Sequence, residues 1–190
     1  AALLLGYTGL GIADRNTVAG VVRAFAALRD LKEGGVLPPV KRRIGGAPGE
    51  YHYEQAIRTQ DANEADALHT LVRERAQSFK LATGARLTFA DDTPDIVAHP
   101  QNRAGWGRLC RLLTKGNRIS KKGECHLTRA DLLNDARDLS LIVMPFHVRS
   151  KLVPLLNELD DAIPGAVWLA ATMPRRGDDR RRLARNRLHV

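Results

Sequence analysis

Hydrophobic and polar residues alternate along the chain in blocks that predict strands and helices in turn. Residues 8–14 (TGLGIAD) predict a short buried strand that ends in an acid, and residues 18–32 carry apolar positions at helical spacing. Asn16 or Thr17 can cap this helix. A strand, an acid and a helix in this order predict the βα unit of a parallel α/β fold, in which the carboxyl ends of the strands build the active site.

The next segments predict a loop, a helix and a pair of strands. Residues 33–50 are rich in glycine and proline, which predicts a long loop. Residues 63–79 have the pattern of an amphipathic helix, with Leu68, Leu71, Val72 and Phe79 on one side. Strands are predicted at 81–90 and 94–100, and the turn-forming sequence ADDT between them indicates that they are neighbours in the sheet.

A second amphipathic helix is predicted over residues 103–117, and Gly116 is predicted to end it. Its apolar stripe comprises Trp106, Leu109 and Leu113. Its basic side comprises Arg108, Arg111 and Lys115.

The rest of the chain continues the alternation of strands and helices. Thr128 and Asp131 resemble a capping box, which predicts a short helix over 128–136. Two strands are predicted at 139–145 and 166–173, and two helices at 150–163 and 178–188. This order predicts an α/β domain with a mainly parallel sheet.

Composition indicates one domain over residues 1–190 with a substantial core. The chain is 44% hydrophobic and 27% charged, as is usual for a globular protein. No apolar run approaches the roughly 20 residues that span a bilayer, and the opening AALLL is too short for a signal peptide, so we expect the chain to begin inside a larger protein. Cys110 and Cys125 do not form a disulfide scaffold, which favours a cytoplasmic location.

The net charge of +9 favours a polyanionic partner, most commonly nucleic acid. Seven basic residues and no acid lie between Arg103 and Lys122, and residues 175–187 add seven arginines. The candidate nucleic-acid or partner surface comprises Arg108, Arg111, Lys115, Lys121 and Lys122. Aromatic residues are few and do not alternate with these charges, so base stacking has little support. A solvated basic face and a docking surface for acidic proteins are the alternatives.

Three sequence stretches carry a family resemblance. The segment YTGLGIADRNTVAGVVRAFA at 7–26, together with RAGWGRLCRLLT at 103–114 and KKGECHLTRADLL at 121–133, resembles the PHP (polymerase and histidinol phosphatase) domain at the N-terminus of bacterial C-family DNA polymerases. The error-prone, translesion branch is the most similar. The resemblance implies a distorted TIM-like barrel that lacks its N-terminal strand in this chain. The polymerase palm, fingers and thumb are not in residues 1–190.

The resemblance also implies where a metal centre would lie. Asp14 is retained from a family Asp-His motif, but Arg15 stands where the histidine would be. Arg86 replaces a family glutamate, and Asp95 falls near the position of another histidine ligand. Arginine is a permanent cation that cannot ligate a metal, so the resemblance implies a vestigial, non-catalytic centre. The alternative for Asp14 is that it caps the following helix or pairs with Arg15 or Arg86.

Other candidate ligands have weaker support. His99 is not a family ligand by register, and His147 corresponds only loosely to a cysteine of the family. Cys125 and His126 are adjacent, but no general base or orienting acid is evident nearby in the sequence.

The resemblance implies an accessory domain of an error-prone DNA polymerase in damage-tolerant replication. No cofactor is expected in this domain, while Mg²⁺ would serve the parent polymerase. The alternative is an active metal-dependent phosphoesterase, a 3′–5′ exonuclease or a pyrophosphatase, with Mn²⁺ or Zn²⁺ at the centre. The expected partners are the remainder of the polymerase chain, DNA, translesion accessory proteins and a sliding clamp, with no membrane.

Overall fold

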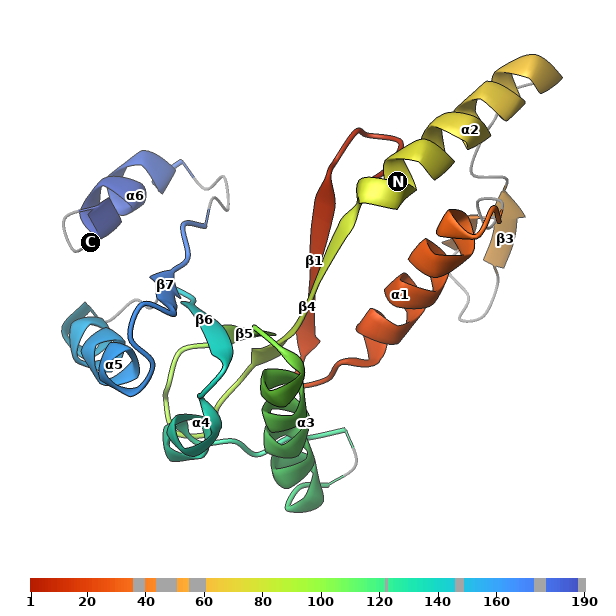
Figure 1. The fold of residues 1–190 in the computed structure, drawn as a ribbon. Helices are drawn as coiled ribbons and strands as arrows, with labels where there is room; N and C mark the ends of the chain where they lie inside the picture. The colour runs from red at the N-terminus through yellow and green to blue at the C-terminus, as the bar shows by residue number, and fades with distance from the viewer. Residues whose placement is uncertain are drawn as a thin grey trace. The chain divides into compact units, whose positions relative to one another are not determined.

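The computed structural model describes residues 1–35, 40–43, 51–54, 61–121, 123–145, 149–172 and 177–187 (Figure 1). These residues belong to two compact units. The first comprises Ala1–Gly11 and Val22–Ala82, and the second comprises Ile12–Val21 and Thr83–Val190. In the part of the chain that the structure describes, no helix is long and apolar enough to cross a membrane.

The described elements follow the alternation that the sequence predicts. The helices are α1 (Ala19–Lys32), α2 (Ala62–Ser78), α3 (Arg103–Arg118), α4 (Arg129–Asp135), α5 (Arg149–Ala162) and α6 (Asp179–Arg187). The strands are β1 (Gly9–Arg15), β2 (Val40–Arg43), β3 (Tyr51–Glu54), β4 (Lys80–Leu87), β5 (Ile96–Pro100), β6 (Leu139–Val143) and β7 (Val167–Leu169).

Five strands form an open sheet in the order β1-β4-β5-β6-β7. β5 is antiparallel to both β4 and β6, while β7 is parallel to β6. β1 and β4 run in the same direction, because Lys80 N–H donates to the Thr8 carbonyl and Asn16 N–H donates to the Arg86 carbonyl. Four strands therefore point the same way and β5 is reversed. The mainly parallel α/β sheet is confirmed in this sense, and the closed barrel stays a prediction.

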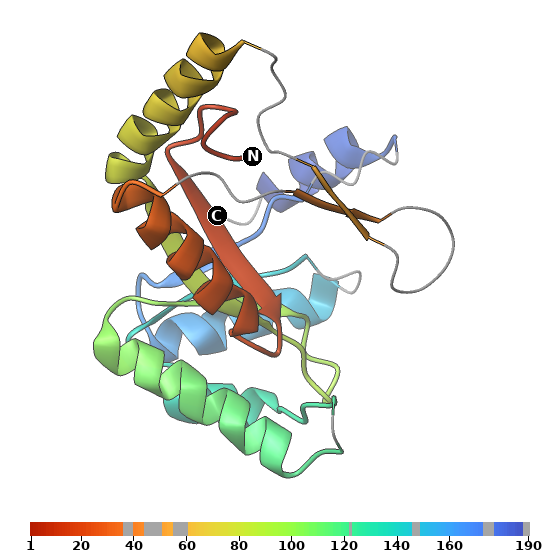
Figure 2. The same ribbon diagram turned by 90° about the vertical axis from the view of Figure 1, so that its right-hand side faces the viewer.

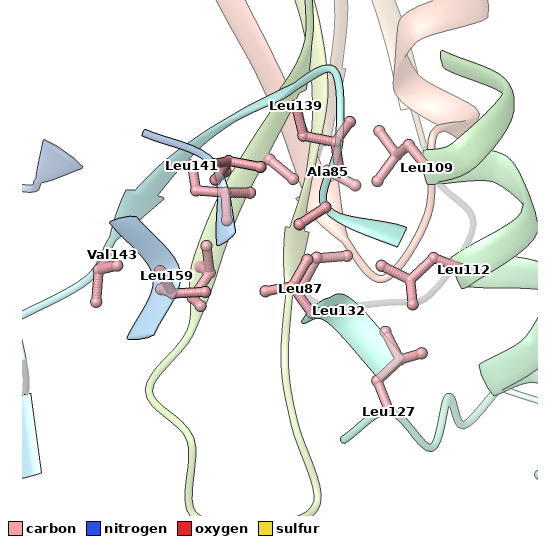
Figure 3. Close-up of a cluster of buried hydrophobic side chains, with 14 of the residues drawn as sticks. Ala85, Leu87, Leu109, Leu112, Leu127, Leu132, Leu139, Leu141, Val143 and Leu159 are labelled. Atoms are coloured by element: carbon pink, nitrogen blue, oxygen red, sulfur yellow. The ribbon is translucent and has the colours of Figure 1, made fainter. Parts of the chain in front are cut away.

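The core of the second unit is a layer of leucine-rich apolar side chains between the sheet and its helices (Figure 3). In β6 every second residue is buried, as expected for a strand with one face on a core. Helix α3 contributes Leu109 and Leu112, and α5 contributes the fully buried Leu159. The described residues include no fully buried polar or charged side chain. The buried side-chain contacts of α3, α4 and α5 with the sheet are thus apolar.

The first unit has a separate, smaller core. Leu3, Leu31, Val72, Ala76 and Phe79 bury one side of α2 against α1 and the N-terminal turn. The amphipathic helix predicted at 63–79 is confirmed, although Leu68 and Leu71 are only half-buried.

Three details of the sequence prediction are wrong. β1 is not a buried strand, because its residues are exposed or half-buried. Residues 33–50 are not simply a loop, since β2 lies within them and pairs with β3. Gly116 does not end α3; it is buried inside the helix, where an added Cβ would lie 2.6 Å from the Cys125 sulfur. Periodicity alone could not separate a helix stop from a close helix–loop contact.

Two glycines of α3 provide a matched test of this packing. An added Cβ at Gly105 would lie 2.1 Å from the Asp138 carbonyl oxygen, whereas one at Gly107 would meet nothing closer than 4.0 Å. We expect Gly105→Ala to lower the free energy of unfolding by about 1–3 kcal/mol through overpacking. Gly107→Ala should raise it by up to about 1 kcal/mol, because alanine favours a helix. Urea unfolding of the two variants measures both; equal effects would contradict the close approach of α3 to Asp138.

Candidate functional site

Asp14, at the end of β1, caps the helix that follows. Its Oδ2 accepts a hydrogen bond of 2.7 Å from the Gly20 N–H in the first turn of α1. Position 20 suits glycine, since a Cβ there would lie 2.2 Å from the same oxygen. A carboxylate is also favourable at the positive end of a helix dipole. The structure therefore shows the helix-capping alternative for Asp14, and its described contacts include no pair with Arg15 or Arg86.

Asn16 joins the ends of β1 and β4. Its backbone N–H donates to the Arg86 carbonyl at 2.9 Å. Its side chain donates to Thr88 Oγ1 at 2.7 Å and accepts from the Thr88 N–H at 2.9 Å. Asn16 has a φ of 49°, a left-handed conformation that asparagine tolerates better than most residues. The helix-capping contact predicted for Asn16 or Thr17 is made by Thr17, whose Oγ1 accepts from the Ala19 N–H at 3.2 Å.

Arg86 and Asp95 form an ion pair across the β4–β5 hairpin. Arg86 Nε lies 2.7 Å from Asp95 Oδ2, and the two side chains are 46% and 29% exposed. The structure thus brings together two of the four residues that the resemblance assigns to a vestigial centre. The Asp14 carboxylate accepts a hydrogen bond at the N-terminus of α1. Arg15 has no ion pair with any described residue.

Arg15 lines a cleft of about 620 Å³ at the carboxyl ends of β1 and β4. The cleft is lined by residues 15–17, 88–90, 117 and 123–125. Thr17 and Thr88 use their oxygens as acceptors, so each hydroxyl proton is left to donate. The cleft is therefore polar and cationic on the β1 side, with Glu124 as the acid among its lining residues.

The described residues do not fit a multinuclear metal centre. Among the described part of the chain no group of three His, Cys, Asp or Glu residues lies close enough to hold a metal. His99 lies away from the cleft lining, with Nδ1 2.8 Å from the Thr83 carbonyl oxygen. His147 falls outside the described residues. A guanidinium in the cleft wall would repel a divalent cation.

Cys125 lines the same cleft but is a poor nucleophile. Burial raises the pKa of its thiol. At neutral pH the thiol stays protonated, and the thiolate is the reactive form. A catalytic role for Cys125 and His126 gains no support from this environment.

The cleft contains residues that the sequence analysis did not single out, namely Thr88, Asn117 and Glu124. Thr88 directly follows β4, Asn117 lies in the last turn of α3, and Glu124 lies in the α3–α4 connection, so Thr88 is far from the other two in the sequence. The sequence offered Asn16, two residues after Asp14, and its bonds to Thr88 join the ends of β1 and β4.

The basic side of α3 is paired with acids of α4 and the turn after it. Arg108 Nε lies 3.5 Å from Asp138 Oδ2, and an Arg111 terminal nitrogen (Nη2) lies 3.6 Å from Asp135 Oδ1. Lys115 Nζ donates to Asp131 Oδ1. These three pairs form an antiparallel ion-pair ladder. Contact of these residues with DNA stays a prediction, and their charge is largely neutralised within the protein.

Of the other two predicted contact residues, Lys121 is exposed and Lys122 falls outside the described residues. Lys121 therefore keeps a positive charge that the ladder does not engage.

Asp131 serves the ladder and the capping box at once. Its second oxygen accepts from the N–H and the hydroxyl of Thr128, which confirms the capping box predicted from the sequence. The hydrogen bond from Lys115 lowers the pKa of the Asp131 carboxyl below 3.8; burial opposes this, and the bonds from Thr128 lower the pKa further.

The similarity to known proteins gives this site a context. No family model matches the chain. Residues of the chain are 40% identical over 184 positions to the error-prone DNA polymerase of Brucella abortus, covering 95% of the chain and 13% of that protein. The corresponding polymerase of Rhodopseudomonas palustris is 40% identical over 183 positions, covering 95% of the chain and 13% of its own length. Error-prone DNA polymerase 1 of Rhizobium meliloti is 39% identical over 178 positions, covering 92% of the chain and 12% of that protein.

The chain is therefore homologous to a segment of bacterial DNA polymerases. The relatives are error-prone DNA polymerases, the branch that the sequence resemblance implied. The chain spans about 13% of the length of these curated relatives.

The helix-capping role of Asp14 can be tested by two substitutions. Asp14→Ala should lower the free energy of unfolding by about 1 kcal/mol, because it removes the acceptor for the Gly20 N–H. Asp14→Asn keeps an oxygen acceptor and should cost about half as much, through loss of the charge–dipole interaction. Urea unfolding measures both, with Asp161→Ala as a control at an exposed acid of α5. Equal losses for alanine and asparagine would contradict the capping role.

Asp131 should contribute to stability in a pH-dependent way. Asp131→Ala is expected to lower the free energy of unfolding by about 1–2 kcal/mol near neutral pH, through loss of the cap and the ion pair. Its folded pKa is lowered, so this contribution is present above about pH 4 and is lost as the pH falls through the folded pKa. Urea unfolding at about pH 7 and about pH 2 measures this contribution. The difference in the free energy of unfolding between Asp131→Ala and the wild type should be smaller at the lower pH.

The control for this experiment is Asp135→Asn. Arg111 is 64% exposed in its pair with Asp135, so the change should fall within about 0.5 kcal/mol. A deficit of Asp131→Ala that stays constant between the two pH values would contradict the role of its ionised carboxylate.

Proposed function

We propose that this chain is the N-terminal, accessory PHP-type domain of an error-prone DNA polymerase, with a degenerate and non-catalytic metal centre. In this role it supports the polymerase body during synthesis past damaged DNA and catalyses no reaction itself. The remainder of the polymerase chain is its first partner, and DNA, translesion accessory proteins and a sliding clamp are further partners in the cytoplasm. The Mg²⁺ of the parent polymerase would act outside these residues.

The similarity to error-prone DNA polymerases over nearly the whole chain supports the polymerase context. The observation that carries the degenerate centre is the position of Arg15, at the carboxyl end of β1 and in the wall of the cleft. Strand ends of this kind are where α/β folds place catalytic ligands. A fixed cation there disfavours a divalent ion.

The contacts of the neighbouring residues support the same proposal. Arg86 is paired with Asp95, and Asp14 is engaged by the N-terminus of α1. Each of these groups has a structural partner and is not held free for a metal. The competing function, an active phosphoesterase with Mn²⁺ or Zn²⁺, would need ligands from outside the described residues.

Metal analysis tests the proposal. After exposure to Mn²⁺ or Zn²⁺ and desalting, the wild-type chain should retain well under one equivalent of metal by elemental analysis. Arg15→His combined with Arg86→Glu should raise Mn²⁺ affinity by roughly tenfold or more, because it removes two cations and places a second carboxylate beside Asp95. The increase should be largest in the longer polymerase, where the family's first strand is present.

The control is Arg15→Gln combined with Arg86→Gln, which removes the same charges without adding a ligand. It should raise affinity less than the His/Glu pair. Stoichiometric metal in the wild type, with chelator-sensitive release of phosphate or nucleotides, would overturn the proposal. An unchanged affinity of the His/Glu variant in the longer polymerase would show that these positions do not mark the centre.

A further inference from the structure

The cleft that Arg15 lines lies within one compact unit. All of its described lining residues belong to the second unit. They come from the end of β1, from the turn after β4, and from the end of α3 with the α3–α4 connection, which Figure 2 shows near one another. The cleft volume of about 620 Å³ falls within the range of about 300–1,000 Å³ that is usual for small-molecule sites. The cleft can therefore hold a ligand larger than a single inorganic ion.

The β1 side of the cleft suits a phosphate group. Arg15 is exposed there and pairs with no acid among the described residues. Its guanidinium stays charged at every relevant pH and offers a fork of N–H donors that matches phosphate oxygens. Thr17 and Thr88 add hydroxyl donors, because each of their oxygens already accepts another hydrogen bond. One cation and two hydroxyls are thus available to one anion without a metal ion.

The tie between Asn16 and Thr88 holds these donors together. Asn16 stands between Arg15 and Thr17 in the chain. Its side chain donates to the Thr88 hydroxyl at 2.7 Å and accepts from the Thr88 N–H at 2.9 Å. The three donor residues are therefore held at one side of the cleft before a ligand binds. Donors that are already in place lose less conformational freedom on binding, which favours affinity.

The opposite side of the cleft suits an uncharged, partly apolar group with hydrogen-bond donors. Phe89 and Cys125 are half-buried there and also pack against the core. The Asn117 amide nitrogen donates to the Leu113 carbonyl at 2.8 Å, which leaves the amide oxygen to accept. Glu124 is the acid of the described lining and would repel a second phosphate. A nucleoside has the required properties, with a flat base for the apolar surface and N–H and O–H donors for the acceptors.

We propose that this cleft binds a nucleoside monophosphate, free or at the phosphorylated end of a DNA strand, without a metal ion. Arg15, Thr17 and Thr88 hold the phosphate. Asn117 and Glu124 accept hydrogen bonds from the nucleoside. This inference rests on the proposed loss of the metal centre, because a cation of the chain itself then becomes the partner of the phosphate.

Isothermal titration calorimetry of the 190-residue chain in EDTA tests this site, with thymidine 5′-monophosphate, thymidine and inorganic phosphate as ligands. The monophosphate should bind most tightly, because each of the other two ligands fills only one side of the cleft. Arg15→Gln should weaken monophosphate binding by about tenfold or more, through loss of hydrogen bonds to a charged group. Arg15→Lys keeps the charge but not the planar fork, so its affinity should be intermediate.

Variants of the opposite side separate the two halves of the cleft. Glu124→Ala should weaken binding of the monophosphate and leave that of inorganic phosphate unchanged or stronger. Glu124→Gln keeps an oxygen acceptor and should retain most of the monophosphate affinity. The matched control is Arg103→Gln, which removes an exposed cation at the other end of α3 and outside the described lining. Screening by salt should keep its effect within about twofold. Circular dichroism should show all variants folded.

A short oligothymidylate distinguishes the two sources of the monophosphate. If the natural ligand is a strand end, the oligothymidylate with a 5′-phosphate should bind more tightly than the same strand with a 5′-hydroxyl. Arg15→Gln should then abolish this difference. Equal affinity of the two strands, with thymidine 5′-monophosphate still bound, would assign the cleft to free nucleotides.

Three outcomes would overturn the inference, and they separate it from the proposed function. Thymidine binding as tight as that of its monophosphate, or an unchanged affinity after Arg15→Gln, would remove the phosphate site. Absence of monophosphate binding by a chain that also retains no metal would overturn this inference alone. Binding that requires Mn²⁺ and is lost in EDTA, together with stoichiometric retained metal, would overturn both this inference and the proposed degenerate centre.

Discussion

The apolar layer between β4–β6 and the helices α3–α5 is the interaction on which the second unit depends. It consists of aliphatic side chains, and the described residues include no buried polar or charged residue whose side chain would fix the packing by directed bonds. Shape therefore has to position α3, and the close approach at Gly105 and Gly116 supplies that fit. The position of α3 in turn sets the ion-pair ladder and the side of the cleft that α3 and the α3–α4 connection line.

Charge is distributed in two different ways over this protein. On α3, a run of basic residues that looks free in the sequence is matched by acids that follow 16 to 30 residues later in the chain. At the cleft, Arg15 pairs with no acid among the described residues, although its neighbours Asp14 and Arg86 are both engaged. Formal net charge thus overstates the basic surface of the α3 segment and gives no indication that Arg15 differs from these paired residues.

The sequence predicted the helices, most strands and the capping box at Thr128, because each depends on residues close together in the chain. It also predicted the β4–β5 pairing, which a short turn connects. It did not predict which charges would pair, since Lys115 and Asp131 meet only after α3 and α4 pack together. Nor did it predict β2, because this four-residue strand lies within a stretch rich in glycine and proline.

The tie between Asn16 and Thr88 joins positions that are 72 residues apart. The entropy lost on closing a flexible loop grows only with the logarithm of its length, so doubling such a loop costs about 0.6 kcal/mol. The excursion between β1 and β4 can therefore gain or lose residues with little effect on the second unit, provided that Asn16 and Thr88 still meet. The β2–β3 ribbon lies inside this excursion, where residues can be added or removed without rebuilding the five-stranded sheet.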